Sequence, residues 1–347
     1  MDQNLSQNIN ALREKVKNAN LPTDLSEKID SMISIVSTAG MSINNFENVA
    51  SYINYVVSLP FNSLSQDTLD LNKAKEVLDK NHYGLQSVKD RILEYMASLI
   101  LNIQKDQGSS MDAPILCLVG LVGTGKTTLA YSIAQALGRS FERIPFGGLG
   151  DIRSIRGQAR GLNDAEPGLI IKKLINAKTK NPVILLDEID RVVEVSRADV
   201  MGVLLEVLDP TQNKAFVDHY VDYPFDLSQV LFVATANNTT NISTAVLDRL
   251  EVIQMPSYSD EEKLNIGKSY LLPKIIERSG LGVGQLVFDE TIWPSIIRPL
   301  GFDSGIRSLE RAIEGISRKA ARMIVEGKIK KDAIIRVDSS NIKAFMT

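Results

Sequence analysis

The stretch Gly120-Leu121-Val122-Gly123-Thr124-Gly125-Lys126-Thr127 has the spacing of a phosphate-binding loop. The apolar run Ile115–Val119 precedes it, and Thr128 to Leu137 repeats apolar residues at helical spacing, so we predict a strand, a loop and a helix. In such a loop the glycines let backbone N–H groups converge on phosphate oxygens at a helix N-terminus, where the helix dipole also favours negative charge. The alternative is a glycine-rich turn with a chance lysine, and the flanking strand and helix favour the phosphate-binding loop.

We therefore expect the residues from Gly120 to Thr128 to bind a nucleotide. Lys126 is expected to reach the β- and γ-phosphates, and the Thr127 hydroxyl is expected to ligate Mg²⁺. The predicted cofactors are ATP and Mg²⁺.

Length and composition indicate a globular protein of two or three domains. The chain has 347 residues, of which 44% are hydrophobic and 23% charged, and its net charge of −3 gives no reason to expect DNA as a partner. Cys117 is the only cysteine, so an intrachain disulfide is excluded. The sequence has neither an apolar run of membrane-spanning length nor a signal-peptide core at its start. We expect a cytoplasmic protein, in the bacterial cytosol or an organelle matrix, with no membrane partner.

Apolar periodicity divides the chain into three parts. Residues 1–60 read as an N-terminal helical arm with a break at Pro22, residues 61–256 as an α/β domain, and residues 257–347 as a small helical lid domain. Between residues 115 and 256 apolar strand runs alternate with helices, which is typical of a doubly wound, mainly parallel sheet. The expected strands are Ile115–Val119, Phe141–Ile144, Val183–Leu186, Val230–Ala234 and Val252–Met255, and Ile334–Val337 is expected as one more short strand in the lid.

Two adjacent carboxylates end the third of these strands. Asp187 and Glu188 follow the apolar run Val183–Leu186, and open α/β sheets bind ligands at the carboxyl ends of their strands. There Asp187 is expected to hold Mg²⁺ through water, and Glu188 to polarise the water that attacks the γ-phosphate. Alone, this pattern also fits an ordinary strand end. About sixty residues after a phosphate-binding loop, it favours catalysis.

Three further polar residues are candidates for the same site. Asn237 ends the run Leu231–Asn237 and is expected to help position the attacking water, although it also fits a residue that merely starts a loop. Arg249 and Arg307 each stand beside an apolar pattern, and arginine suits phosphate because its planar fork makes two bonds at once. Spacing alone leaves both arginines open as ordinary solvated charges.

The order of several short runs resembles the AAA+ module of Lon-type ATP-dependent proteases. The resemblance extends from about residue 12 to the C-terminus and includes the arm. The runs that carry it, besides the phosphate-binding loop, are His82-Tyr83-Gly84-Leu85, Ile155-Arg156-Gly157, Asn181 to Asp190, Leu204 to Pro210, Asp218-His219-Tyr220, Ser308-Leu309-Glu310-Arg311 and Arg318-Lys319-Ala320.

This resemblance implies the P-loop NTPase fold of the AAA+ class and a role for each matching residue. Lys126 and Thr127 fall on Walker A, Asp187 and Glu188 on Walker B, and Asn237 on sensor 1. Arg249 falls on the arginine finger, which acts on nucleotide held by a neighbouring subunit, and Arg307 falls on sensor 2. The adenine pocket would involve His82, Tyr83 and Leu85, and the implied assembly is a homo-oligomer, a hexameric ring, that acts on unfolded or degradation-targeted proteins.

The chain departs from the family pattern at two loops. Leu121 and Val122 stand where the family usually has two prolines, which changes no phosphate ligand. In the substrate pore loop, Leu162 replaces an aromatic residue and Asn163 an aliphatic one. Because an aromatic side chain grips an extended chain through a large contact area, we expect a weaker grip here. This departure favours the alternative of an ATP-dependent assembly or regulatory module with little translocation.

The resemblance also implies a peptidase domain with a serine–lysine dyad after the lid. No such sequence occurs before Thr347, so we expect no peptide cleavage by this polypeptide through that chemistry. We expect either a fragment of a longer protease or a stand-alone ATPase. A peptidase domain or partner thus belongs among the expected partners of the natural protein.

Overall fold

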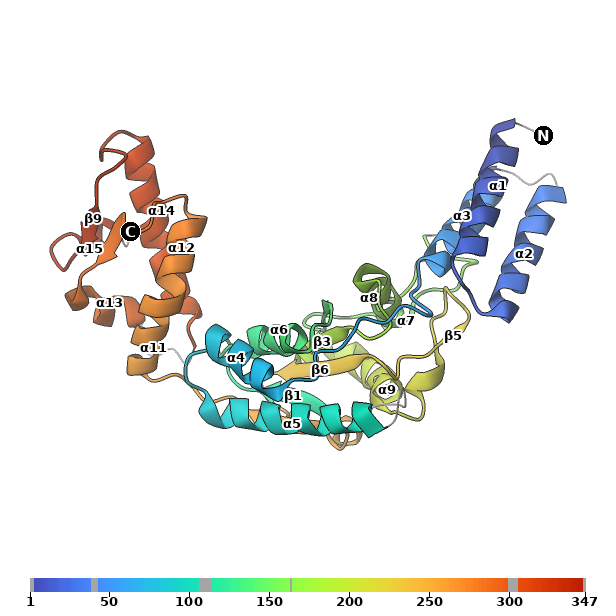
Figure 1. Cartoon of the computed structure of the whole chain (residues 1–347), viewed down its shortest axis with the longest axis horizontal. Coiled ribbons are helices and arrows are strands. Elements are labelled where there is room, and N and C mark those ends of the chain that lie inside the picture. The colour runs from blue at the N-terminus through green and yellow to red at the C-terminus, as the bar shows by residue number, and fades with distance from the viewer. Residues whose placement is uncertain (1–2, 39–42, 106–113, 163, 299–304, 346–347) are drawn as a thin grey trace. The chain divides into compact units, whose positions relative to one another are not determined.

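The computed structural model describes residues 3–38, 43–105, 114–162, 164–298 and 305–345. The chain forms two compact units (Figure 1). The first comprises residues 1–78, 90–119 and 127–253, and the second comprises residues 79–89, 120–126 and 254–347. The three domain boundaries predicted above remain predictions. The second unit combines the lid with the phosphate-binding loop and with the run around Tyr83.

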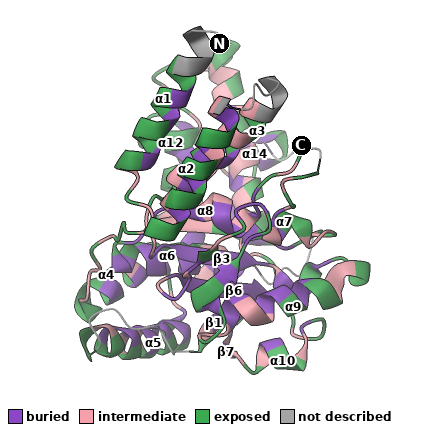
Figure 2. Cartoon of the chain, turned by 90° about the vertical axis from the view of Figure 1, so that its right-hand side faces the viewer, coloured by how far each residue is buried: buried purple, intermediate pink, exposed green. Residues whose placement is uncertain are grey.

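In its described residues, the arm consists of three helices, α1 (Gln3–Asn18), α2 (Thr23–Thr38) and α3 (Ile43–Val57). Each helix buries residues three to five apart, such as Leu12 and Val16 of α1 and Leu25 and Ile29 of α2, and exposes its other face (Figure 2). These side chains belong to the same hydrophobic cluster as the core of the α/β part. The arm is therefore packed onto the α/β part of the first unit.

Among the described residues, the central sheet of the first unit has five strands in the order β2-β3-β6-β1-β7. The strands are β1 (Ile115–Val119), β2 (Phe141–Pro145), β3 (Val183–Asp187), β6 (Leu231–Ala236) and β7 (Leu250–Gln254). The pairs β2–β3, β3–β6 and β6–β1 are parallel. Every residue of β3 and β6 is buried, as expected for strands covered on both faces (Figure 2). All five predicted strands and the doubly wound α/β class are confirmed.

The sheet register positions the candidate site. Val119 at the end of β1 pairs with Ala236 at the end of β6, and Leu186 of β3 pairs with Ala234 of β6. The carboxyl ends of the three strands therefore lie along one edge of the sheet. Asp187, Asn237 and the residue that leads into the phosphate-binding loop all start from this edge.

Helices and short segments complete the α/β part. The helices are α4 (Leu71–Asn81), α5 (Gln86–Lys105), α6 (Lys126–Leu137), α7 (Arg153–Arg156), α8 (Leu169–Ala177), α9 (Arg197–Leu208) and α10 (Thr244–Leu247). Three 3₁₀ turns are Ile189–Arg191, Glu194–Ser196 and Asn213–Ala215, and a small antiparallel hairpin joins β4 (Phe216–Val217) to β5 (Pro224–Phe225). Sequence periodicity did not predict this hairpin.

The lid has its own apolar core, built around Trp293, Ile296, Leu309 and Ile313. Its elements are α11 (Asp260–Ile266), a π-helical turn (Gly267–Leu271), α12 (Leu272–Arg278), β8 (Leu286–Phe288), a 3₁₀ turn (Glu290–Ile292), α13 (Trp293–Ile297), α14 (Arg307–Val325), β9 (Ile335–Val337) and α15 (Ile342–Phe345). Helix α11 starts with a capping box between Ser259 and Glu262, which satisfies two backbone donors at its first turn. Strand β9 was predicted, whereas its parallel partner β8 was not. In the part of the chain that the structure describes, no helix is long and apolar enough to cross a membrane.

Candidate nucleotide site

The carboxylate of Asp187 is held from two sides at the end of β3. Asp187 is buried, and its Oδ1 accepts a hydrogen bond of 2.5 Å from the Thr235 hydroxyl on β6. Its Oδ2 accepts a hydrogen bond of 2.7 Å from Nε of Arg143 on β2. Arg143 and Thr235 were not predicted as site residues. They fix the orientation of a carboxylate that is otherwise an oxygen ligand suited to a hard cation.

Glu188 has a left-handed backbone conformation, with φ of 58° and ψ of 49°. A residue with a side chain adopts this region rarely and at an energetic cost, and such residues are concentrated at functional sites. Its backbone N–H donates to the same Thr235 hydroxyl at 2.9 Å, and its carboxylate lies 3.5 Å from Arg191. Thr235 thus positions both acidic residues, one through the side chain and one through the backbone.

Asn237 follows β6 at the same edge, in a turn organised by Asp190. The buried Asp190 carboxylate accepts hydrogen bonds from the backbone N–H of Asn237 at 3.1 Å and of Asn238 at 3.4 Å. Asp190 belongs to the quoted run that contains Walker B, but no role was predicted for it. Thr127 and Thr128 lie in the first turn of α6, the helix that follows the phosphate-binding loop.

In the second unit, side chains of the phosphate-binding loop donate hydrogen bonds to carbonyl oxygens of the same loop. The Lys126 Nζ donates to the carbonyl oxygens of Gly120 at 2.6 Å and of Leu121 at 3.0 Å. The Thr124 hydroxyl donates to the same Leu121 carbonyl at 2.9 Å, and its own carbonyl accepts from the Tyr258 hydroxyl at 3.1 Å. The ammonium group of Lys126 therefore points back into the loop.

The turn before α14 lies directly against this loop. The Ile306 backbone N–H donates to the Gly123 carbonyl at 3.1 Å, and a Cβ on Gly123 would lie 3.3 Å from Cγ of Arg307. Gly123 has a φ of 84°, which a residue with a side chain rarely adopts, so only glycine suits this position. The structure thus brings the predicted sensor-2 residue next to the predicted phosphate-binding loop.

The run around Tyr83 also packs on lid residues. The Tyr83 hydroxyl accepts a hydrogen bond of 3.0 Å from the Asn265 amide, and its ring meets that of Tyr270 edge-on at 6.4 Å. Leu85 and His82 are buried, and the His82 carbonyl accepts from Lys89 Nζ at 2.7 Å. Tyr83, in contrast, has 37% of its surface exposed.

Arg249 is held within its own chain. Its Nη2 donates to Asp209 at 2.8 Å, and its Nη1 donates to the Ala245 carbonyl at 3.0 Å. Hydrogen bonding by Thr211 and the guanidinium of Arg249 lower the pKa of Asp209 well below its ordinary value. One third of the Arg249 side chain is exposed, so the group is partly available at the surface.

Of the two predicted pore-loop residues, one is described by the structure. Leu162 is exposed over 53% of its surface, whereas Asn163 lies outside the described residues. No predicted role of a site residue is tested by these positions, and each remains a prediction. The residues that sequence patterns missed are Arg143, Thr235, Asp190, Asp209 and Tyr258, which all act on a predicted residue through a contact distant in sequence.

Comparison with known proteins identifies two parts of the chain. Residues 116–258 match the model of the ATPase family associated with various cellular activities (AAA), and residues 277–333 match the Lon protease AAA+ ATPase lid domain. Nucleotide binding is thereby assigned to the first of these parts.

Full-length relatives are similar over nearly the whole chain. The Lon protease of Clostridioides difficile (strain 630) is 42% identical over 345 residues, which cover 99% of this chain and 43% of that protein. Lon protease 2 of Thermus thermophilus is 40% identical over 346 residues, 98% of this chain and 43% of the relative. The Lon protease of Desulforamulus reducens is 45% identical over 298 residues, 86% and 36% respectively. The chain thus spans roughly two-fifths of the length of these relatives. The chain is a Lon-type AAA+ module, with an ATPase part and a lid part.

Proposed function

We propose that this module binds MgATP and hydrolyses it with Glu188 as the group that activates water. Lys126 and the backbone of residues 120–126 would bind the phosphates, and Asn237 would orient the attacking water. The hydroxyl of Thr127 and the carboxylate of Asp187 provide oxygen ligands, which suit Mg²⁺. When bound, Mg²⁺ would neutralise charge on the phosphate oxygens.

The observation that carries this proposal is the geometry at the end of β3. Asp187 and Glu188 are both oriented by Thr235, at the sheet edge where β1 ends and the phosphate-binding loop begins. A carboxyl residue whose left-handed backbone is held by a hydrogen bond from its N–H to a side chain of the neighbouring strand supports a catalytic role rather than a packing role. An ordinary strand end would need neither the left-handed residue nor the shared hydroxyl.

We further propose that the module works as a homo-oligomeric ring, with six subunits, and that it moves unfolded or degradation-targeted protein chains. Arg249 would then act on nucleotide held by a neighbouring subunit. The relatives carry the name Lon protease, so the proposal includes a peptidase domain that receives the chains. A second candidate is an ATP-dependent assembly module, which is favoured by exposed Leu162 where the family has an aromatic residue.

Steady-state ATP hydrolysis with and without casein, combined with size-exclusion light scattering in the presence of ATP, tests these proposals. Hydrolysis by a ring that accelerates with casein would support the motor. A ring that forms with ATP but whose hydrolysis ignores casein would support the assembly module. A chain that neither binds nor hydrolyses ATP would contradict both.

A further inference from the structure

The loop between Gly157 and Gly168, called the substrate loop here, is closed at its base by one buried carboxylate. Asp218 is fully buried, and its Oδ2 accepts from the Gly168 backbone N–H at 2.7 Å. Gly157 lies so close that a Cβ there would stand 2.7 Å from Asp218 and 2.9 Å from the Gly168 nitrogen. Both ends of the loop are therefore fixed beside Asp218.

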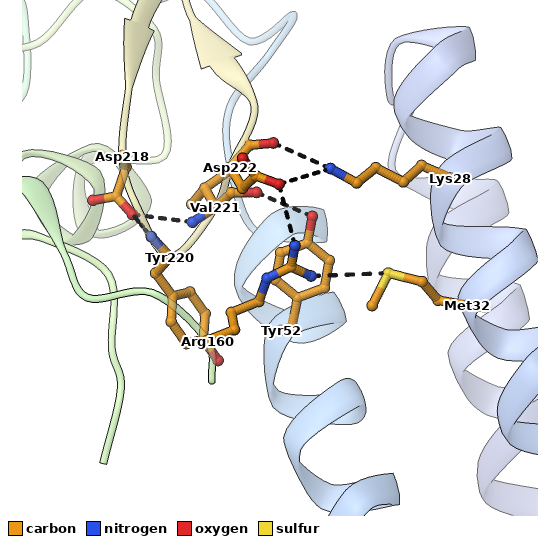
Figure 3. Close-up of polar contacts among 8 residues, drawn as sticks. All are labelled: Lys28, Met32, Tyr52, Arg160, Asp218, Tyr220, Val221 and Asp222. Carbon is orange, nitrogen blue, oxygen red and sulfur yellow. Dashed lines mark hydrogen bonds and ion pairs between the residues drawn. The ribbon is translucent and has the colours of Figure 1, made fainter. Parts of the chain in front are cut away.

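The residues that follow Asp218 connect this base to the arm (Figure 3). The Tyr220 ring lies 6.1 Å from that of Tyr52 on α3, and the Val221 carbonyl accepts from the Tyr52 hydroxyl at 3.1 Å. Asp222 pairs with Lys28 of α2 at 3.1 Å. Burial raises the pKa of Tyr52, so its hydroxyl keeps the proton that it donates. The segment 218–222 thus contacts the substrate loop at one end and two arm helices at the other.

Arg160 of the substrate loop reaches the same cluster. Its guanidinium carbon lies 4.1 Å from the centre of the Tyr52 ring, and its Nη2 lies 3.4 Å from the Asp222 carboxylate. Its Nη1 points to the sulfur of Met32 on α2 at 3.9 Å (Figure 3). A planar guanidinium stacked on a ring while it pairs with a carboxylate uses properties that lysine does not combine.

A cavity separates the tip of the loop from the arm. It has a volume of about 470 Å³ and is lined by Asn48 and Ser51 of α3 and by Arg160, Leu162 and Asp164 of the loop. A space of this size with polar walls holds water rather than apolar packing. The Arg160 side chain therefore bridges a loop and an arm that are otherwise separated at this point.

We propose that Arg160 is a positioning residue that couples the N-terminal arm to the substrate loop, so that the docked arm sets the orientation in which the loop meets a protein chain. This inference rests on the proposed function, because it assigns the loop to substrate. The arm then contributes to substrate binding, because its contacts orient the loop that meets the protein chain. None of these contacts involves the nucleotide site.

The test compares Arg160→Ala and Arg160→Lys with a matched control, Arg153→Ala, in the full chain. Arg153 is an exposed arginine four residues before Gly157 and pairs with Asp151 at 2.7 Å. The casein concentration for half-maximal stimulation of ATP hydrolysis is measured, together with the rate without casein. For Arg160→Ala we expect that concentration to rise about fivefold or more while the basal rate changes less than twofold; Arg160→Lys should be intermediate and Arg153→Ala unchanged.

Tyr52→Phe separates stacking from hydrogen bonding. It retains the ring beneath Arg160 and removes only the hydroxyl bonded to Val221, so its casein concentration for half-maximal stimulation should stay within twofold of wild type.

A double variant of Arg160→Ala and Tyr52→Leu should need no more casein for half-maximal stimulation than Arg160→Ala alone, since the coupling is already lost. Equal casein responses of wild type and Arg160→Ala, or equal losses in Arg160→Ala and Arg153→Ala, would overturn the inference.

Hydrogen exchange provides a readout that does not depend on substrate. In Arg160→Ala the amides of residues 157–168 and of α3 should exchange faster than in wild type, and in Arg153→Ala they should not. If wild type ignored casein but this exchange difference appeared, the proposed translocation would fail while the coupling would stand. Unchanged exchange in Arg160→Ala would refute the coupling itself.

Discussion

A single strained residue, Glu188, carries the strongest catalytic expectation. Its left-handed backbone and its N–H bond to Thr235 fix the main chain from which the side chain projects, and its carboxylate lies 3.5 Å from Arg191. An isosteric substitution should therefore leave the geometry unchanged and alter only the chemistry.

Glu188→Gln should lower ATP turnover about 100-fold or more, because the amide cannot accept a proton from water. Affinity for nucleotide should change less than about threefold, since the phosphate-binding groups are untouched. Turnover from a coupled assay and binding of a fluorescent nucleotide measure the two effects. Glu194→Gln, at an exposed position six residues later, is the control. Turnover near the wild-type value would exclude Glu188 as the activating base.

The ion pair between Asp209 and Arg249 should show in the pH dependence of stability. Hydrogen bonding by Thr211 and pairing with Arg249 lower the pKa of Asp209 from its ordinary 3.8. Since folding lowers this pKa, the unfolded chain takes up the proton first as the pH falls. The stabilisation by the carboxylate is thus complete above the ordinary pKa and is lost as the pH falls through the folded-state value.

The difference in urea midpoint between wild type and Asp209→Asn should accordingly be constant from about pH 7 to about pH 5 and narrow below about pH 4. Urea titrations followed by circular dichroism at these pH values provide the measurement. Asp199→Asn, at an exposed position on α9, controls for the general effect of a lost negative charge. A midpoint difference that grows on acidification would contradict the assignment.

At the scale of elements, the substrate loop combines a rigid base with an exposed tip. Leu162 at the tip offers less contact area than an aromatic side chain. If the loop grips protein chains, Leu162→Tyr should raise the stimulation of ATP hydrolysis by casein about twofold or more. Val283→Tyr, at a fully exposed lid position, is the matched control. Unchanged stimulation in Leu162→Tyr would favour the assembly module.

Elements were predictable from sequence where a pattern was long enough to repeat. The five strands of the main sheet were found because each is a run of apolar residues between helices. The β4–β5 hairpin was missed because each strand has two residues, too few to show alternation. The π-helical turn Gly267–Leu271 was read as ordinary helix, because a single π-helical turn between two α-helical segments is too short to show a period of its own.

In the candidate site, the motif residues could be predicted from the sequence, whereas the residues that hold them in place could not. Lys126, Asp187 and Glu188 stand next to strand and helix patterns that predict their location. Arg143 meets Asp187 across 44 positions of sequence, and Arg249 meets Asp209 across 40. Ion pairs of this kind have no local periodicity, so only the folded sheet reveals them.

At the scale of the whole molecule, the proposed ring makes Arg249 and Glu188 parts of different active sites. A mixture of Arg249→Ala and Glu188→Gln chains should then hydrolyse ATP faster than the sum of the two variants alone, because a site with Glu188 on one subunit and Arg249 on the next is complete. Turnover is measured across mixing ratios at a concentration where light scattering shows rings. Additive rates throughout would place Arg249 outside a neighbour's site.

The closed base of the substrate loop has a consequence for how the loop sequence can vary. Gly157 and Gly168 meet at Asp218, and Arg160 adds a third anchor, so the ends of the loop are held together without any contribution from the exposed side chain of Leu162. Substitutions between these anchors cost little loop-closure entropy, because the two ends of the loop are already held together. If the loop contacts protein substrates as proposed, substitutions at its tip can change which chains are bound while the residues of the nucleotide site stay the same.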